Sequence, residues 1–138
     1  MAFTSVQKIR FDDVDGAGIV YYPQFFHLCH AAFEDFFDSA APVSYPQLVR
    51  ERRMGFPTVA IESTFSAPLV YGDVAVVELT VERMGRSSVT FGYVIRKRDG
   101  AICFSASITT VLVSIDTMKP VPLSDEHRSL FERLLLKK

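Results

Sequence analysis

The sequence predicts an α+β fold in which one antiparallel sheet is covered on its apolar face by an amphipathic helix. Between Pro23 and Pro42, apolar residues recur at spacings of three and four, which is the period of a helix. After Gly55 the period falls to two and remains so up to Ile115. A helix followed by a run of strands is typical of α+β proteins, and 138 residues suit a single domain spanning residues 1–138.

The composition excludes several other classes of protein. Hydrophobic residues make up 49% of the chain and charged residues 22%, so the chain is not intrinsically disordered. The 15 lysines and arginines nearly balance the 16 acidic residues, which argues against a general nucleic-acid-binding protein. No stretch approaches the ~18 uninterrupted apolar residues of a membrane span, so we expect no membrane partner.

The cysteines and the N-terminal residues indicate the compartment. Cys29 and Cys103 lie far apart in apolar segments, whereas a secreted disulfide scaffold would use more cysteines. They are predicted to be buried free thiols in a reducing compartment. Residues 1–11 carry Lys8 and Arg10 in an alternating pattern and lack the apolar core of a signal peptide. We therefore expect a soluble cytoplasmic protein.

The N-terminal third is predicted to hold a strand, a loop and the main helix. Residues 6–11 alternate between apolar and polar side chains, as a short strand does, and the acidic, glycine-containing residues 12–18 predict a loop. Pro23 suits the first turn of the helix, because its missing N–H costs nothing there. The helix is expected to end at residues 40–42. Its apolar stripe, which we assign mostly to the core, consists of Phe25, Leu28, Cys29, Ala32, Phe33, Phe36 and Phe37.

Two shorter helices are predicted elsewhere in the chain. Residues 45–54 form the first, which has a basic end and Gly55 as its C-terminal cap. The second follows Ser124, an N-cap residue, and Asp125 and Glu126 are favourably placed against its helix dipole. The apolar stripe of this last helix consists of Leu130, Phe131, Leu134 and Leu135.

Four segments between the helices alternate with a period of two. They cover residues 59–71, 77–82, 89–95 and 101–115, and turn-forming residues such as Arg98-Asp99-Gly100 separate them. Successive strands joined by tight turns predict an antiparallel meander. The second face of this sheet and its edge strands would remain exposed in a single chain, and dimerisation would cover them.

The most informative stretch for chemistry is residues 12–23, where Asp12, Asp13 and Asp15 lie on a glycine-containing loop just before a helix. A helix N-terminus offers unpaired N–H groups and a positive dipole end, which can stabilise an oxyanion developing on a carbonyl. A nearby carboxylate can act as a nucleophile or as a general base for water. The combination suits hydrolysis of an activated ester. The simpler alternative is that these aspartates only cap turns.

The pattern Asp-x-Asp-x-x-Gly-Ile-Val-Tyr-Tyr-Pro at residues 13–23, followed by an aromatic-rich helix, resembles the 4-hydroxybenzoyl-CoA thioesterase family of hotdog-fold proteins. The order of elements is similar as well, through about Ile115. The resemblance implies a sheet wrapped around a long central helix, homodimers that pair into a homotetramer, and a site at the subunit interface. It also implies hydrolysis of an aryl or short acyl-CoA thioester with no metal and no cofactor.

By the same resemblance, Asp15 is the catalytic carboxylate, which attacks the thioester carbonyl or activates the water that does so. The backbone N–H of Tyr22 points at the thioester oxygen, and the following Pro23 biases Tyr22 away from helical ψ. Asp13 shapes the loop, and Gly18 allows close backbone approach. The paired tyrosines Tyr21 and Tyr22 favour aromatic acyl groups.

Coenzyme A carries phosphates, so cations must hold it. The resemblance places basic and hydroxyl residues at a turn between two middle strands, which here are Arg86, Ser87 and Ser88. Arg86 is the expected phosphate contact, through charge-assisted hydrogen bonds. Met84 and Gly85 depart from the family's pattern, which has a denser basic run there. The alternative is that this segment is only an exposed polar turn.

Other chemistry fits the sequence less well. His27 and His30 have a spacing that could hold a metal, but no third ligand is evident, so a solvated surface pair is expected. A Gly-x-Ser-x-Gly elbow for a Ser-His-Asp hydrolase is absent from the sequence. A hotdog dehydratase would need a histidine near Asp15, and none lies near that loop in the sequence, so a dehydratase is disfavoured. The main alternative is a hotdog protein that binds acyl-CoA or acyl carrier protein without turnover.

Overall fold

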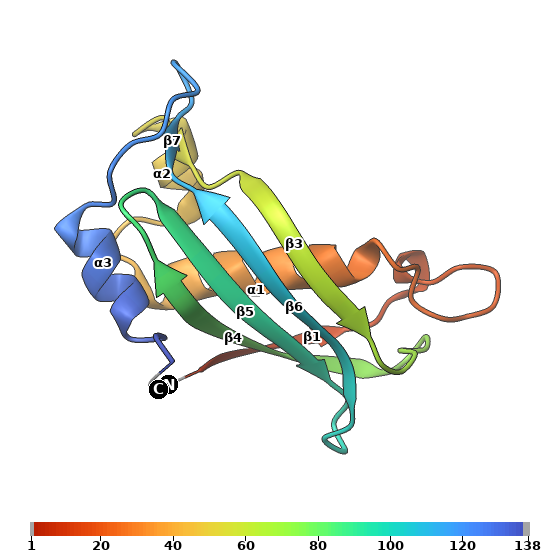
Figure 1. Ribbon diagram of the computed structural model, residues 1–138. Helices are drawn as coiled ribbons and strands as arrows, with labels where there is room; N and C mark the ends of the chain where they lie inside the picture. Colours follow the sequence, from red (N-terminus) through yellow and green to blue (C-terminus); the bar gives the residue numbers. More distant parts are fainter. Residues whose placement is uncertain (1, 137–138) are drawn as a thin grey trace.

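The sheet and the main helix form two layers in the computed structural model, which describes residues 2–136 (Figure 1). Residues 1 and 137–138 of the predicted domain lie outside the described residues. Five antiparallel strands lie in the order β1-β4-β5-β6-β3, so the predicted α+β class is confirmed. The strands are β1 (Phe3–Lys8), β3 (Thr58–Phe65), β4 (Val74–Met84), β5 (Ser88–Arg96) and β6 (Ile102–Val111). The remaining elements are η1 (Phe11–Asp13), α1 (Gln24–Ala40), α2 (Tyr45–Arg50), β2 (Met54–Gly55), β7 (Val113–Ser114) and α3 (Asp125–Glu132).

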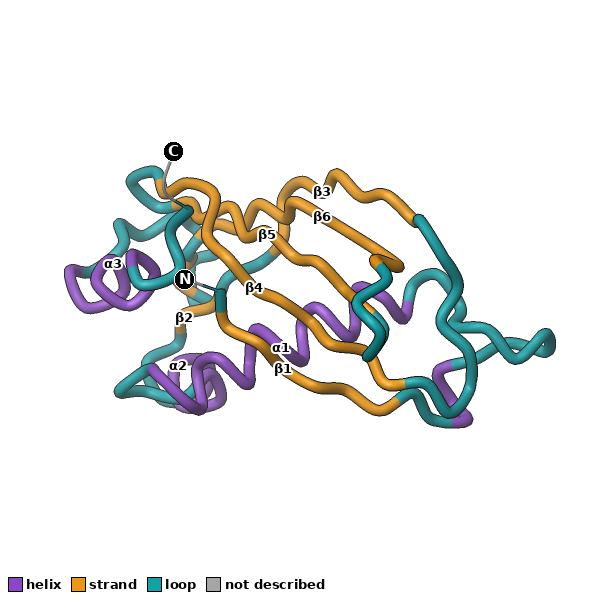
Figure 2. Tube along the Cα trace, turned by 90° about the horizontal axis from the view of Figure 1, so that it is seen from below, coloured by secondary structure: helices purple, strands orange, loops and turns teal. Residues whose placement is uncertain are grey.

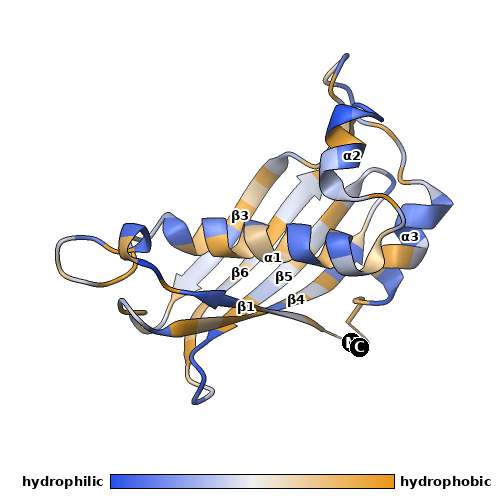
Figure 3. Ribbon diagram, turned by 180° about the vertical axis from the view of Figure 1, so that it is seen from behind, coloured by the Kyte–Doolittle hydropathy of each residue, from blue (hydrophilic) through white to orange (hydrophobic). Residues whose placement is uncertain are grey.

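Helix α1 lies along one face of the sheet (Figure 2). In Figure 3 blue polar and orange apolar residues alternate along α1, as an amphipathic helix requires. Its seven buried residues are the predicted stripe, from Phe25 to Phe37, so this prediction is confirmed. The helix ends where Ala41 donates its N–H to the Phe37 carbonyl and Pro42 follows, because proline cannot continue a helix.

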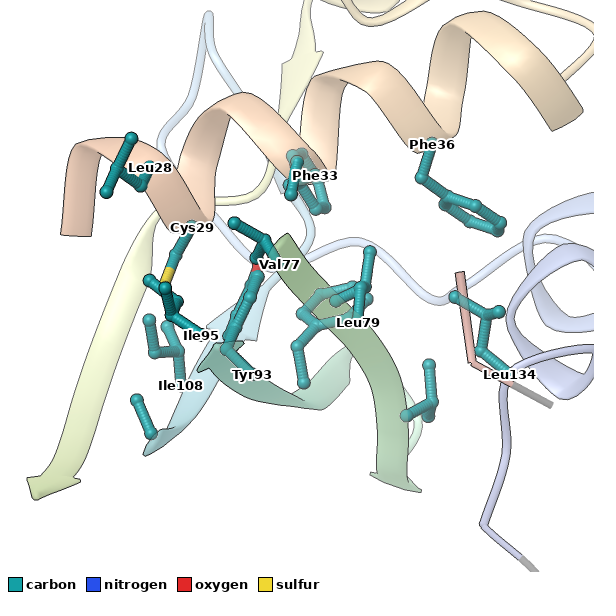
Figure 4. Packing of buried hydrophobic residues seen from close by; sticks show 14 of the residues in the cluster. Leu28, Cys29, Phe33, Phe36, Val77, Leu79, Tyr93, Ile95, Ile108 and Leu134 are labelled. Carbon is teal, nitrogen blue, oxygen red and sulfur yellow. The ribbon is translucent and has the colours of Figure 1, made fainter. Parts of the chain in front are cut away.

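The stripe of α1 meets alternate residues of the strands beneath it. Figure 4 shows Cys29 and Phe33 pointing from α1 toward Val77, Tyr93 and Ile95 of the sheet. This alternation is regular along β4 because successive side chains of a strand point to opposite faces. The buried residues of β4 are Ala75, Val77, Leu79 and Val81.

The four long strands do not form one meander, so that prediction is wrong in one respect. Strands β4, β5 and β6 are consecutive neighbours, but β3 pairs with β6 at the far edge of the sheet. The other side of β4 is occupied by β1. Strand β3 also ends at Phe65, earlier than predicted: the N–H groups of Ser66 and Ala67 both donate to Cys103 O, and Pro68 follows. A hydrophobic period sets which face a residue takes but not which strand becomes its neighbour.

The second helix is shorter than predicted, and Gly55 is not its cap. Helix α2 ends at Arg50. The chain then reverses at Arg53, which has a φ of 57° and accepts a hydrogen bond from Ile115 N–H on its carbonyl. Gly55 belongs to β2, where it pairs with Val113. The contact between segments distant in sequence therefore overrides the local capping pattern.

The first strand is displaced toward the N-terminus relative to the predicted residues 6–11. Strand β1 ends at Lys8, although Ile9 still donates its N–H to Asp73 O at 2.9 Å. Phe11 begins the 3-10 turn η1 instead of ending the strand. The turn forms because Asp13 Oδ2 accepts the Arg10 N–H at 2.8 Å.

Helix α3 covers the end of the sheet at which β4 turns into β5 (Figure 1). Ser124 caps it as predicted, because its side chain accepts the His127 N–H at 3.1 Å. Phe131 is fully buried, with its ring centroid 5.4 Å from that of Phe91 on β5 and 6.1 Å from that of Phe37 on α1. In residues 2–136, no helix is long and apolar enough to cross a membrane.

Strand β3 leaves one edge of the sheet without a neighbour among the described residues. All 8 of its residues are exposed. Ile61 and Phe65 pair with Ile108 and Phe104, which are buried on the face toward α1, yet they are themselves 47% and 49% exposed. A strand edge with free N–H and C=O groups and apolar side chains is ready to pair with another chain.

Candidate active site

Residues 13–21 form a short hairpin between η1 and α1. It projects beyond the sheet as the red-orange loop in Figure 1. Tyr21 donates its N–H to Asp13 O at 3.1 Å, and Asp15 donates its N–H to Ile19 O at 2.9 Å. The loop predicted for residues 12–18 is therefore part of a hydrogen-bonded hairpin, which backbone bonds from Val20 N–H to Leu69 O and from Tyr71 N–H to Gly18 O join to the segment after β3.

Gly18 closes this hairpin. Its N–H donates to Asp15 O at 3.0 Å, and its φ of 79° is the left-handed conformation that glycine adopts without strain. A Cβ at this position would meet nothing within 4 Å, so the backbone angle rather than crowding requires glycine. The close approach of a substrate to Gly18 stays a prediction.

Asp13 connects the two ends of the hairpin, as expected for a residue that shapes the loop. One carboxylate oxygen accepts the Arg10 N–H, and the other accepts Gln24 Nε2 of α1 at 3.3 Å. Its carbonyl accepts the Tyr21 N–H. These three bonds fix where α1 begins relative to the hairpin.

Asp15 is exposed at the turn of the hairpin. Its Oδ1 accepts the Ala17 N–H at 2.9 Å, which is the bond of an aspartate that orders its own turn. Oδ2 has no hydrogen-bond partner in the described part of the chain. One oxygen therefore fixes the orientation of the carboxylate, and the other is free to act on a ligand or a water molecule. Within a single chain this is also the geometry of a capping residue.

Tyr22 lies where the hairpin enters α1. Its carbonyl accepts the Phe25 N–H at 3.3 Å, whereas its own N–H has no acceptor within residues 2–136. The Tyr22 side chain is 60% exposed, and its ring centroid lies 6.4 Å from that of Phe65 on β3. A free N–H next to the positive end of a 17-residue helix is a donor for a developing negative charge.

Phe65 lies at this site, although no pattern in the sequence marks it as a site residue. Its ring lies 5.6 Å from Phe25 and 5.1 Å from Phe104, in addition to its contact with Tyr22. Phe65 has an odd number in a segment whose odd-numbered residues are apolar, and this pattern predicts a core residue. It is half exposed because β3 lies at the edge of the sheet, which the alternation does not reveal.

A cavity of about 90 Å³ lies between α1 and the strands, on the side of β3. Aromatic residues line it together with the exposed residues His30, Thr58 and Ile61, so it opens near the free edge. Tyr93 also contributes to its wall, and burial raises the pKa of this phenol well above its usual value. Tyr93 is therefore a neutral phenol at physiological pH.

The two histidines of α1 are both exposed, in agreement with the prediction of a solvated pair. His30 Nε2 lies 2.7 Å from the Glu34 carboxylate, one turn further along the helix. This is a histidine–acid pair, but it belongs to α1 and not to the hairpin that carries Asp15.

The predicted coenzyme A residues lie at the other end of the sheet. Arg86 and Ser87 form the turn between β4 and β5, and Ser88 begins β5. The side chain of Arg86 is exposed, and no described residue forms an ion pair with it. Within one chain Asp15 and Gly18 lie on the hairpin and Tyr22 at its junction with α1, whereas this turn lies beside α3 (Figure 1).

The chain matches the model of a protein family described as the thioesterase-like superfamily over residues 9–131. It is 29% identical to a 1,4-dihydroxy-2-naphthoyl-CoA hydrolase of Synechocystis sp., over 88% of this chain and 88% of that protein. It is 32% identical to the 4-hydroxybenzoyl-CoA thioesterase of Pseudomonas sp., over 63% of this chain and 62% of that protein. These relatives are named as hydrolases of aromatic CoA thioesters.

Solved structures agree with the fold. A 1,4-dihydroxy-2-naphthoyl-CoA thioesterase from Synechocystis superposes with a TM-score of 0.87 at 26% identity, over 97% of this chain and 98% of that one. A member of the thioesterase superfamily from Jannaschia sp. gives a TM-score of 0.89 at 25% identity, over 99% and 94%. The expected hotdog-type α+β fold, an antiparallel sheet with helices, is confirmed.

Proposed function

The chain belongs to the thioesterase-like superfamily, and we propose from this premise that it hydrolyses an aromatic acyl-CoA thioester to the free acid and coenzyme A. One observation carries the proposal. The hairpin before α1 presents a carboxylate with a free oxygen, Asp15, and a backbone N–H without an acceptor in the described residues, Tyr22. A base or nucleophile beside an oxyanion donor is what acyl transfer to water needs.

Each residue has a distinct part in this chemistry. The Tyr22 N–H polarises the thioester carbonyl and stabilises the negative charge that forms on its oxygen. Asp15 either attacks the carbonyl carbon or removes a proton from the attacking water. In the first route the C–S bond breaks as a mixed anhydride with Asp15 forms, and water then hydrolyses this anhydride and regenerates the carboxylate. In the second route the water oxygen bonds to the carbonyl carbon, its proton passes to Asp15, and the C–S bond breaks. In both routes the coenzyme A thiolate leaves.

We propose that a second copy of the chain completes the site. Asp15 and Tyr22 face solvent in a single chain, and the neighbouring edge strand β3 exposes Ile61 and Phe65. Pairing of two β3 edges would satisfy their free N–H and C=O groups and bury these side chains. The same pairing would cover the open side of the hairpin. A covered site limits the access of bulk water, so that hydrolysis is confined to the thioester bound there.

The topology supports this assembly. In a two-fold antiparallel pair of β3 strands, the Phe65 end of one copy meets the Thr58 end of the other. The Tyr22 hairpin lies at the Phe65 end, whereas Thr58 pairs with Thr110, which pairs in turn with Val89 next to the β4–β5 turn. The hairpin of one copy and the Arg86 turn of the other copy therefore lie at the same end of the combined sheet. Two strand spacings, about 10 Å, separate this turn from the β3 strand of its own copy.

The same geometry supports an aromatic acyl group. The cavity beneath α1 opens near Thr58 and His30, so it would face the hairpin of the second copy. Aromatic side chains on both sides can hold an aryl ring by edge or stacked contacts. We propose that Arg86, Ser87 and Ser88 of the copy that supplies this cavity contact the phosphates of coenzyme A, across from the hairpin of the other copy.

Two finer proposals accompany the dimer. We propose that two dimers pair into a homotetramer, because the sheet face opposite α1 stays open in the dimer. We also propose that the protein works in the cytoplasm, since Cys29 and Cys103 are both free and buried.

The proposal is tested with a panel of thioesters and detection of the released thiol. The panel contains the 4-hydroxybenzoyl, 1,4-dihydroxy-2-naphthoyl, benzoyl, phenylacetyl and butyryl thioesters of coenzyme A. We expect aryl thioesters to be hydrolysed with higher kcat/KM than butyryl-CoA. Binding of these compounds without thiol release would instead support the non-catalytic alternative, in which the Asp15–Ala17 bond only orders the turn.

The variant Asp15→Asn separates catalysis from folding. The amide keeps the hydrogen-bond acceptor of the turn but is neither a base nor a nucleophile, so kcat should fall at least about 100-fold with the fold retained. Asp12→Asn is the matched control, because Asp12 is exposed in the same segment and should alter kcat less than twofold. Full activity of a folded Asp15→Asn protein would refute the assignment.

A further inference from the structure

The turn between β4 and β5 is held from outside by the segment that ends in α3. Arg128 of α3 donates from Nη2 to Gly85 O at 2.8 Å and reaches Arg86 O at 3.4 Å. Leu123, just before α3, donates its N–H to Arg86 O at 2.8 Å. The two carbonyls that begin the turn therefore point toward the C-terminal segment.

The other two carbonyls of the turn are occupied as well. Leu112 donates its N–H to Ser87 O at 2.8 Å, and Gly85 donates its N–H to Ser88 O at 2.8 Å. The N–H groups of Arg86 and Ser87, by contrast, have no acceptor in the described part of the chain. Successive free N–H groups at a turn whose carbonyls face the other way form an anion-binding concavity.

Arg128 is well suited to hold this shape. Its Nη2 carries two N–H groups, so this one nitrogen can reach both neighbouring carbonyls. The planar guanidinium fixes the direction of both N–H groups, whereas the donors of a lysine ammonium rotate. Helix α3 fixes its position, because its buried residues Leu130 and Phe131 pack into the core. The bonds from Arg128 itself are exposed to solvent, so their loss should alter the turn more than the stability of the fold.

We propose that Arg128 is a positioning residue, which keeps the β4–β5 turn in the form whose free N–H groups and Arg86 side chain bind a phosphate of coenzyme A. The inference rests on the proposed function for its substrate. It assigns to α3 a part in binding the nucleotide end of the thioester, at a distance from Asp15 and without contact with the acyl group.

The test compares two thioesters of the same aryl acid, one of coenzyme A and one of N-acetylcysteamine, which lacks every phosphate. In Arg128→Ala we expect KM for the coenzyme A thioester to rise about tenfold with kcat nearly unchanged, as for loss of one charge-assisted contact. KM for the truncated thioester should change less than twofold. An equal rise for both substrates, or no rise for either, would overturn the inference.

Two further variants separate positioning from charge. Arg128→Lys keeps the charge, but its ammonium ends one bond short of the Nη2 position and its donors are not fixed in direction, so KM for the coenzyme A thioester should stay raised. Full recovery would show that only charge matters and would overturn the positioning role. Arg98→Ala removes an exposed arginine from the turn between β5 and β6, at the other end of the same strand, and should leave KM within twofold.

Calorimetry keeps this inference separate from the proposed function. If the wild-type protein hydrolyses neither thioester, the proposed hydrolase fails, and the binding of free coenzyme A still tests the turn. A dissociation constant that Arg128→Ala raises about tenfold supports the inference. A constant that the variant leaves unchanged, or a wild-type protein that does not bind coenzyme A, overturns it.

Discussion

The two ends of α1 differ in how their aromatic residues are covered. At the C-terminal end Phe37 is fully buried and packs against Tyr45, Phe56 and Phe131. At the N-terminal end Tyr22 is 60% exposed, although its ring also contacts aromatic neighbours. The chain thus supplies its own cover at the α3 end and leaves the hairpin end open.

This difference separates an aromatic cluster that stabilises the fold from one that is available for an interface or a ligand. Aromatic side chains bury large areas, so a closed cluster such as that at the α3 end contributes strongly to stability. The open cluster at the hairpin end loses that contribution in a single chain and is better explained as part of an interface or a ligand site. The free edge of β3 lies on the same side, which argues for a second copy as the cover.

The largest expected effect tests the closed end. Phe37→Ala removes a fully buried ring and should lower the free energy of unfolding by about 3–5 kcal/mol, measured by urea denaturation. Phe11→Ala is the matched control, because the Phe11 side chain is 76% exposed and should cost less than about 1 kcal/mol. Equal losses would mean that the two ends do not differ in packing.

The next effect tests the open end. Ile61→Lys puts a charge on the face of β3 that a second copy would cover. Because removing this ammonium group from water costs free energy, the dimer should dissociate at micromolar concentration. Sedimentation velocity would then report at most half the mass of the wild-type assembly, down to the single 15.5 kDa chain, and aryl-CoA hydrolysis should fall with the loss of the β3 interface.

The control for Ile61→Lys is Thr64→Lys on the same strand. Thr64 pairs with Ser105 and therefore points to the opposite face of the sheet. This lysine should leave the dimer intact. A wild-type protein that sediments as a single chain, or an Ile61→Lys protein that keeps the wild-type mass, would contradict the β3 interface.

A smaller effect is expected from His127 in the closed cluster. Burial lowers the pKa of this histidine, Glu126 opposes the shift and Arg52 adds to it. Its Nδ1 has no hydrogen-bond partner in residues 2–136. A histidine whose pKa is lower in the folded state takes up its proton more readily when unfolded, so stability is full above about pH 6.5 and falls as the pH drops below it. The melting temperature of His127→Phe should therefore fall less between pH 7.5 and 5.5 than that of the wild type.

The smallest expected effect concerns the two buried thiols of the core. Burial raises the pKa of Cys29 to about 12, and burial also raises the pKa of Cys103. Because only the thiolate reacts with iodoacetamide, neither cysteine should be alkylated at pH 8 until the protein is unfolded. Mass spectrometry before and after addition of guanidinium checks this. Rapid labelling of the native protein would show that the core around these cysteines opens.

Local features of the sequence predicted most of the elements correctly. The stripe from Phe25 to Phe37 gave the buried face of α1, and Ser124 gave the start of α3, because a helical period and a cap act over a few residues. The hairpin turn at Arg98-Asp99-Gly100 is present between β5 and β6, where Gly100 N–H donates to Lys97 O. The error at Gly55 came from a distant partner, Val113, which recruits it into β2.

The sequence by itself determined the face each segment turns to the core and the loop that carries Asp15 and Tyr22, because periodicity, caps and turn residues act between near neighbours. Only the tertiary structure decided that β3 lies at the edge, that Phe65 meets Tyr22, and that Arg128 holds the Arg86 turn. These contacts join residues about 40 positions apart, where no local preference exists and only the packing of the whole chain selects the partner.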